Sequence, residues 1–170
     1  SQDMLDTVPR YEWRQMLFVM CYMHSVVQER RKFGPIGWNI RYEFNQSDLS
    51  ACVQFLQNHL QEMDAKKLAS PTWPTVTYMI SSIQYGGRIT DGFDELLMDT
   101  YAGKYFNSSA LTKGLEIYPG YTVPDTADIN EFRAAIERLP AQESPEIFGL
   151  HPNADLTFRT LAVADLVETV

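Results

Sequence analysis

The amino-acid sequence predicts a mainly α-helical domain, a bundle of helices joined by short extended or turn segments. Apolar residues recur at three- and four-residue steps in several stretches, as they do on one face of a helix. Clusters of glycine and proline separate these stretches. The chain has 170 residues, of which 45 % are hydrophobic and 21 % charged, an ordinary globular balance. This length suits one domain with a sizeable core.

The first predicted helix carries an apolar stripe and ends in a basic turn. Its stripe consists of Trp13, Met16, Leu17, Met20, Cys21, His24 and Val27. Residues 29–32 place three cations in the predicted last turn, where each interacts favourably with the helix dipole by roughly 0.3 to 1 kcal/mol. Gly34 can adopt a left-handed cap, and Pro35 cannot continue the helix. We therefore expect a sharp exit.

Three more helices are expected in the middle of the chain, each with a start signal and an apolar stripe. The expected start signals are Ser47, Pro74 at a first helical position, and Thr90 or Asp91. The second helix runs to about Met63, Gly86-Gly87 ends the third, and residues 107–109 end the fourth. The three stripes are Leu49, Val53, Leu56, Leu60 and Met63; Val76, Met79, Ile80 and Ile83; and Phe93, Leu96, Leu97, Tyr101 and Tyr105.

Prolines interrupt the last third of the chain. Between Gly114 and Pro124, helix breakers alternate with apolar residues, which favours extended or turn-like structure. Thr126 is the expected cap of a short helix whose stripe is Ile129, Phe132, Ile136 and Leu139. In residues 157–170 the stripe Leu161, Ala164, Leu166 and Val167 has roughly helical spacing and stops in mid-pattern. We expect one mostly helical domain whose ends were set by truncation.

The charge balance limits the partners that the chain can bind directly. A formal net charge of -8 works against binding to nucleic acid, anionic lipid or another acidic polymer. The run Arg30-Arg31-Lys32 is typical of a solvated helix end, although it could act locally as a basic patch. No apolar run approaches the roughly 20 residues that span a bilayer. Residues 1–10 have no signal-peptide pattern, so a cytosolic protein is the default.

No complete catalytic motif is present in the sequence. A phosphate-binding loop is missing, and residues 92–95 have the pattern of a helix start rather than of an ATPase acidic pair. His59 and Glu62 could supply two metal ligands, but no third lies nearby, so a surface pair is the better interpretation. Cys21 and Cys52 fall on apolar positions and are expected to be small buried hydrophobes without a disulfide framework. Catalysis within these residues is not expected.

Three separated motifs give the chain a strong resemblance to a known family. They are residues 28–44, QERRKFGPIGWNIRYEF; residues 85–91, YGGRITD; and residues 144–155, SPEIFGLHPNAD. In this order they resemble dynein heavy chains. Residues 55–60 and Gly120-Tyr121 look most like axonemal outer-arm chains of the gamma type. Arg41 departs from a proline common in the family pattern, which affects the expected turn geometry there.

The resemblance implies a helical lid, the small subdomain of the sixth AAA+ module in a larger ring. Residues 1–143 would form this lid, and residues 144–170 the connector and the start of the C-terminal region. In the family, the main ATPase site lies in the first module and the sixth is regarded as non-nucleotide-binding. The resemblance therefore implies no cofactor, metal or catalytic residue in this segment, with ATP and Mg held elsewhere in the parent chain.

The implied function is structural support of ATP-driven, microtubule-based movement in cilia or flagella. Implied partners are the neighbouring AAA+ modules and C-terminal region of the same heavy chain and other dynein subunits; microtubules would be reached only through distant parts, and nucleic acid and membrane not at all. The implied location is the cytoplasm, cytoskeleton and axoneme. Trp38, Tyr42 and Phe44 are expected to bury against neighbouring helices, and Arg30, Arg31 and Arg88 to pair with carboxylates or helix ends.

Two alternatives remain open from the sequence. A free-standing helical module could recruit a protein partner through an exposed apolar groove, because the stripe in residues 157–170 has no evident partner. A metal-dependent enzyme built on His59 and Glu62 is the more distant alternative.

Overall fold

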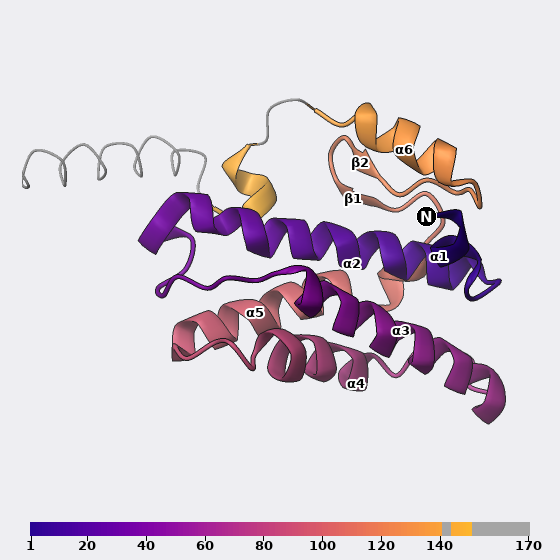
Figure 1. The fold of residues 1–170 in the computed structure, drawn as a ribbon, viewed down its shortest axis with the longest axis horizontal. Coiled ribbons are helices and arrows are strands. Elements are labelled where there is room, and N and C mark those ends of the chain that lie inside the picture. The colour runs from indigo at the N-terminus through magenta and orange to yellow at the C-terminus, as the bar shows by residue number, and fades with distance from the viewer. Residues whose placement is uncertain (141–143, 151–170) are drawn as a thin grey trace, which may run out of the picture.

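The computed structural model describes residues 1–140 and 144–150 and is mainly helical, as predicted (Figure 1). The predicted helical stripe in residues 157–170 lies outside the described residues. The elements are α1 (Gln2–Asp6), α2 (Tyr11–Glu29), η1 (Arg30–Ile36), α3 (Gln46–Lys66), α4 (Trp73–Tyr78), η2 (Met79–Tyr85), α5 (Gly92–Tyr105), η3 (Ser108–Leu111), β1 (Glu116–Tyr118), β2 (Tyr121–Thr122), α6 (Ile129–Glu137) and η4 (Pro145–Phe148).

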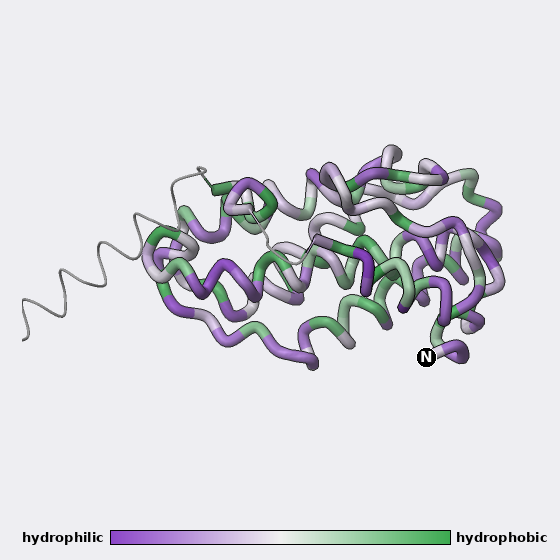
Figure 2. The backbone as a smooth tube through the Cα atoms, turned by 90° about the horizontal axis from the view of Figure 1, so that it is seen from above, coloured by the Kyte–Doolittle hydropathy of each residue, from purple (hydrophilic) through white to green (hydrophobic). Residues whose placement is uncertain are grey.

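Helix α2 lies at the centre of the fold. In Figure 1, α3, α4 and α5 lie on one side of it, and the hairpin, α6 and η4 on the other. The α2 residues Trp13, Met16, Met20, Met23 and Val27 are fully buried. Hydrophilic and hydrophobic residues alternate along the helices (Figure 2), as in helices that bury one face and expose the other. The hydrophobic core is therefore built around a single helix.

The exit from α2 is sharp, but the cations do not lie where the sequence analysis placed them. The α-helix ends at Glu29, and the basic residues continue into the 3-10 helix η1. Gly34 has φ 54° and ψ -131°, a combination that glycine adopts without a Cβ clash. Lys32 forms an ion pair with Glu29. Arg30 turns inward and is buried, so the basic run is not simply a solvated helix end.

Three helix starts differ from the predicted ones by one or two residues. Asn45 caps α3 in place of Ser47, because its side chain and that of Asp48 exchange hydrogen bonds with each other's backbone in a capping box. Asp128 caps α6 in place of Thr126. Pro74 occupies the second helical position rather than the first, following the N-cap Thr72. Asp91, one of the two predicted caps, starts α5.

The predicted stripe of α5 is partly wrong. Phe93 and Leu96 were expected to be buried, yet they are 76 % and 64 % exposed. The buried face consists instead of Asp94, Met98, Tyr101, Ala102 and Tyr105. Asp94 accepts hydrogen bonds from the neighbouring extended segment, which turns that side of the helix inward. A buried carboxylate with three donors thus decides the rotation of α5, which hydrophobic periodicity alone cannot show.

Other predicted stripes are also modified. Residues 79–85 form a wide π-helical turn, so Tyr85 is buried while Ile83 is exposed. Ile136 of α6 is exposed as well. The interval from Gly114 to Pro124 is extended, as predicted, with β1 and β2 pairing antiparallel. Gly120 has φ 90° in the turn between them, a conformation suited to glycine.

Candidate functional site

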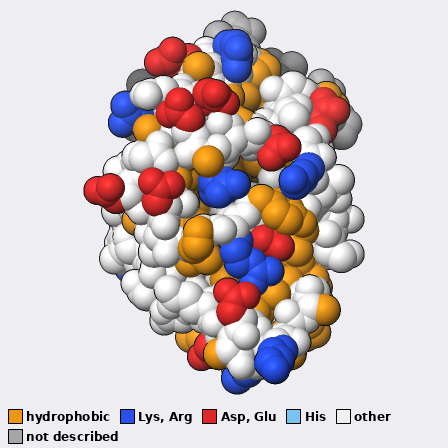
Figure 3. Space-filling model, turned by 90° about the vertical axis from the view of Figure 1, so that its right-hand side faces the viewer, with side chains coloured by type: hydrophobic (Ala, Val, Ile, Leu, Met, Phe, Trp, Pro, Cys, Tyr) orange, Lys and Arg blue, Asp and Glu red, His pale blue; other side chains and the backbone are white. Residues whose placement is uncertain are grey.

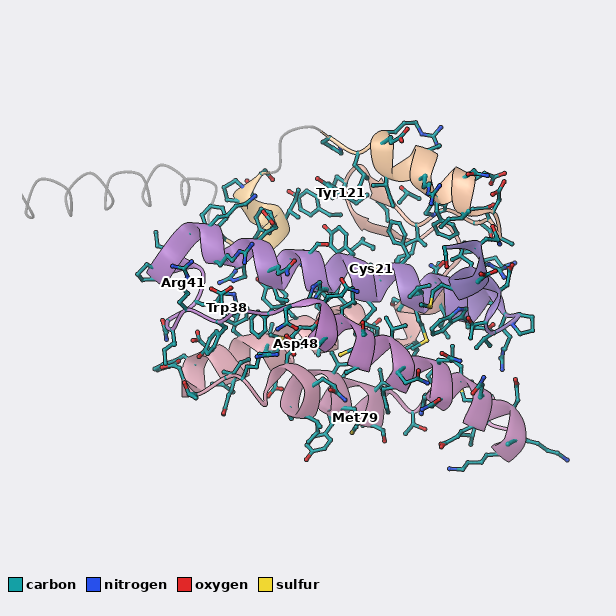
Figure 4. All side chains as sticks on the ribbon, in the orientation of Figure 1. Cys21, Trp38, Arg41, Asp48, Met79 and Tyr121 are labelled. Atoms are coloured by element: carbon teal, nitrogen blue, oxygen red, sulfur yellow. The ribbon has the colours of Figure 1, made fainter. Side chains whose placement is uncertain are left out.

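An aromatic cluster follows η1 and fills the space between α2 and its neighbours. Trp38, Tyr42 and Phe44 are all buried. The ring centroids of Trp38 and Phe44 lie 5.6 Å apart, and those of Phe44 and Tyr85 lie 5.4 Å apart, both in edge-on geometry. The indole Nε1 of Trp38 donates to the Val27 carbonyl at 3.0 Å. Trp38 therefore satisfies a carbonyl near the end of α2 while packing between α2 and α5 (Figure 4).

Arg30 is a buried cation at the end of this cluster, 4 % exposed. Its Nε donates to the Gly37 carbonyl at 2.9 Å, and its Nη1 donates to the Tyr101 hydroxyl at 2.7 Å and to the Phe148 carbonyl. The Tyr101 hydroxyl donates to the same Phe148 carbonyl. The guanidinium carbon also lies 5.6 Å from the Trp38 ring centroid. Arg30 thus joins η1, α5 and η4.

The partners of Arg30 are carbonyls, a hydroxyl and aromatic rings. Phe148 is the last residue of η4, so its carbonyl is one of the acceptors that a helix end leaves without an intrahelical donor. Burial lowers the pKa of the Arg30 guanidinium, and the hydroxyl of Tyr101 partly offsets this. An arginine remains protonated in such a setting. The positive charge is therefore used to hold backbone oxygens in place.

Asp94 is a second buried charge, which the sequence analysis missed. It is 2 % exposed and accepts from the backbone N–H groups of Asn39 and Ile40 at 3.0 and 3.2 Å. The Tyr42 hydroxyl donates to it at 2.9 Å. Its position three residues after the cap Asp91 could have indicated a polar helix start, but not the contact with residues 39–42. Burial, and then this hydrogen bond, raise the pKa of Tyr42.

Arg88 and Asp48 form an ion pair between two helix starts. The Arg88 Nε lies 2.9 Å from both carboxylate oxygens of Asp48, a residue that is buried at the first turn of α3. Arg31 lies 3.7 Å from Glu43, and both side chains are exposed. Arg41 is also exposed, 3.5 Å from the same glutamate. Exposed pairs of this kind contribute about 0 to 1 kcal/mol. The Arg88 side chain is also partly exposed, but its carboxylate partner is buried, which makes this pair the structurally more important one.

Two of the three histidines, His24 and His59, lie among the described residues and take structural positions. His24 is buried, and its Nδ1 lies 2.7 Å from the Tyr85 hydroxyl. His59 Nε2 accepts from the Thr72 backbone N–H at 3.0 Å, which helps to hold the turn between α3 and α4. Burial lowers the pKa of both histidines. Within residues 1–140 and 144–150, no group of three histidine, cysteine or acidic side chains could hold a metal ion.

The two cysteines differ in environment. Cys52 is buried, as predicted, and burial raises the pKa of its thiol to about 12. Cys21 was expected to be buried but is exposed on the outer face of α2, where it lines an apolar groove. The neighbouring stripe positions Met20 and His24 face inward, so Cys21 lies at the edge of that stripe.

On the end of the molecule drawn in Figure 3, acidic and basic side chains are interspersed. Among the residues that the structure describes, no helix is long and apolar enough to cross a bilayer.

The fold and the buried polar network define a helical packing domain in which charged side chains hold helix ends and loops together. Residues 13–154 match the family model described as the dynein heavy chain AAA lid domain. The chain belongs to the dynein heavy chain family.

Axonemal and flagellar dyneins are among the curated proteins similar to this chain. Over the whole chain, the dynein gamma chain of the flagellar outer arm of Chlamydomonas reinhardtii is 65 % identical, and dynein axonemal heavy chain 5 of Mus musculus is 49 % identical. Dynein axonemal heavy chain 9 of Homo sapiens is 40 % identical over the whole chain. The predicted likeness to outer-arm gamma chains is confirmed. The chain spans 4 % of the length of each of these relatives. No comparison supports the free-standing module.

Proposed function

We propose that this chain is the non-catalytic lid of the sixth AAA+ module in an axonemal dynein heavy chain and that it passes rigid-body motion to the C-terminal region. The observation that carries the proposal is that Arg30 and Tyr101 both donate hydrogen bonds to the Phe148 carbonyl. This contact ties η4, near the end of the described residues, to η1 and α5. A displacement of η1 and α5 is therefore passed to η4 through these hydrogen bonds.

The rest of the network supports a stiff element. Asp94 joins α5 to the segment at Asn39 and Ile40, and Arg88 joins the start of α3 to the loop before α5. Buried charges with several hydrogen-bond partners fix one arrangement, since any other would leave a charge desolvated and unpaired. A packed domain with such contacts moves as a unit.

ATP hydrolysis would take place outside this segment. ATP and Mg would be held by other modules of the parent heavy chain, and no cofactor would bind to the lid. The flagellar and axonemal names of the relatives favour a place in the axoneme of a cilium or flagellum. Partners would be the neighbouring AAA+ modules and C-terminal region of the same chain and other dynein subunits, with microtubules contacted only through distant regions.

The test is a comparison of ATP turnover with microtubule gliding in the full heavy chain. Arg30→Leu should retain ATP hydrolysis but slow gliding several-fold, because η4 is no longer held to the bundle. Arg31→Leu removes an exposed neighbouring cation and should leave both rates unchanged. Unaltered gliding in Arg30→Leu would contradict the mechanical role. Saturable, micromolar ATP binding by this 170-residue segment in calorimetry would contradict the non-catalytic assignment.

A further inference from the structure

Helix α5 is apolar on two opposite faces. Its inner face, which includes Met98, Tyr101 and Tyr105, is buried in the bundle. On its outer face, Phe93 and Leu96 are 76 % and 64 % exposed, the two highest values among the large apolar residues that the structure describes. A helix that is covered on one side only has a polar outer face. The outer face of α5 therefore has the composition of a surface that is covered as well.

The neighbouring segment α4–η2 is also apolar on its outside. Tyr78 and Ile83 are both exposed. Residues 68–87 contain no acidic, basic or histidine residue, although 21 % of the whole chain is charged. In Figure 1, α4 and α5 lie side by side, across α2 from α6. Two adjacent elements thus present apolar side chains to the same side of the bundle.

A buried hydrogen bond joins the two elements of this layer. The Ser81 hydroxyl of η2 donates to the Asp99 carboxylate of α5 at 2.6 Å. Ile83 and Leu96 each lie within one helical turn of this contact along their own element. Exposed apolar residues gathered on one layer mark an interaction site more often than exposed residues scattered singly. We call this layer the α5 outer surface, defined by Tyr78, Ile83, Phe93 and Leu96.

The charges beside the α5 outer surface are negative. Glu95 and Asp99 are exposed and lie one helical turn apart on α5. Among the residues that the structure describes, neither forms an ion pair. The two cations nearest to them in sequence are engaged elsewhere, because Arg88 pairs with a carboxylate of α3 and Lys104 lies over an aromatic ring of its own helix. An acidic border favours a basic protein surface and disfavours nucleic acid or anionic lipid.

We infer that the α5 outer surface docks against another part of the same heavy chain, one that presents apolar side chains beside lysine or arginine. Phe93 and Leu96 are the apolar anchors, and Glu95 faces the cations of the partner. The chain spans 4 % of the length of each relative compared above, so a heavy chain of that size holds ample surface for this contact. The inference rests on the proposed place of the lid in a motor ring, but not on transmission of motion through η4.

The first test is photo-cross-linking in the intact heavy chain. Phe93→p-benzoylphenylalanine should link, on irradiation, to a peptide of the same chain outside this segment in which lysine or arginine adjoins apolar residues. The same replacement at Glu131, which is exposed on α6, should not link to that peptide. Peptide mass spectrometry identifies the products. No link from position 93, a link to a peptide without a cation, or a link to a second copy or another protein would overturn the inference.

The second test probes the acidic border by hydroxyl-radical oxidation of Phe93 and Leu96 in the intact heavy chain. Glu95→Arg places a like charge against the cations of the partner and should increase oxidation of both residues at least threefold. Because Glu95 is exposed, the variant should keep the wild-type melting temperature. Glu137→Arg makes the same change on α6 and should leave the oxidation unchanged. Equal oxidation in the two variants would overturn the proposed docking.

Both measurements are independent of motility. A cross-link from position 93 together with unaltered gliding in Arg30→Leu would support the docking and contradict only the mechanical role of the lid. Slowed gliding in Arg30→Leu without a cross-link from position 93 would overturn the docking alone.

Discussion

The Tyr42 hydroxyl donates a 2.9 Å hydrogen bond to the carboxylate of Asp94, across 52 residues of sequence. Because the same carboxylate accepts from the backbone of residues 39 and 40, it fixes both the rotation of α5 and the path of the chain between η1 and α3. One acidic side chain therefore positions two segments that hydrophobic contacts alone would leave free to slide.

Replacing this carboxylate should destabilise the domain strongly. Asp94→Ala leaves two backbone N–H groups and a buried hydroxyl without their acceptor, which we expect to lower the free energy of unfolding by about 3 kcal/mol. Glu95→Ala, at the adjacent exposed position, should change it by less than about 0.5 kcal/mol. Urea unfolding monitored by circular dichroism measures both. Similar urea midpoints for the two variants would show that the Asp94 carboxylate does not stabilise the domain.

Charge reversal at Arg88 tests the ion pair with Asp48. In Arg88→Glu the buried Asp48 carboxylate loses a donor and faces a like charge, so we expect a loss of about 1 to 3 kcal/mol and a lower melting temperature. Arg31→Glu alters an exposed pair and should shift stability by no more than about 1 kcal/mol. Differential scanning fluorimetry resolves the difference. An unchanged melting temperature in Arg88→Glu would count against the pair.

Alanine at Gly149 tests whether the exit conformation is required. Gly149 has φ 70°, and the added Cβ would lie 3.1 Å from the Tyr101 hydroxyl oxygen, so Gly149→Ala should destabilise the protein by roughly 1 to 2 kcal/mol. Gly103→Ala is the matched control, since Gly103 lies inside α5 with open space around it. That change should stabilise by up to about 1 kcal/mol. Chemical denaturation of both variants checks the predicted opposite signs.

Stability should fall on mild acidification. Burial lowers the pKa of His24 and His59 below the ordinary 6.5, so the unfolded chain binds more protons than the folded one in this range. Their contribution is fully present above about pH 6.5 and is lost as pH falls through the lowered folded-state values. Asp91, whose pKa is lowered by its hydrogen bonds to Asn39 and the α5 backbone, acts in a separate window below its ordinary 3.8.

The measurement is the urea midpoint between pH 7.5 and 5. His24→Gln should flatten this dependence, because it removes the more deeply buried imidazole. His59→Gln should flatten it less. A wild-type urea midpoint that rises on acidification would contradict the predicted fall in stability.

The longer helices were predictable from sequence, whereas the short α1 was not, and the rotations and starts of the longer ones were less predictable. Hydrophobic spacing placed Leu56 and Leu60 on the buried face of α3. The same reasoning failed for Phe93 and Leu96, since Asp94, rather than an apolar residue, determines which side of α5 faces inward. Asn45 was missed as a cap because the reciprocal hydrogen bonds between Asn45 and Asp48 are seen only in the structure.

The candidate site was predicted as a set of residue types, without their partners. The aromatic residues at 38, 42 and 44 are buried, and Arg88 has a carboxylate partner. Arg30 binds carbonyls and Tyr101, a tertiary arrangement across 118 residues that no local pattern encodes. Asp94 escaped notice because an acidic residue in a first helical turn is ordinarily solvated. The division between residues 1–143 and 144–170 stays a prediction.

The central claim, that Arg30 ties η4 to the bundle, is tested most directly by amide hydrogen exchange in Arg30→Leu and wild-type chains. The amides of Ile147 in η4 and of Gly149 and Leu150 directly after it are hydrogen-bonded and should exchange at least tenfold faster in Arg30→Leu, while the amides of Leu56 and Leu60 in α3 keep their protection. Unchanged exchange in η4 would contradict the account.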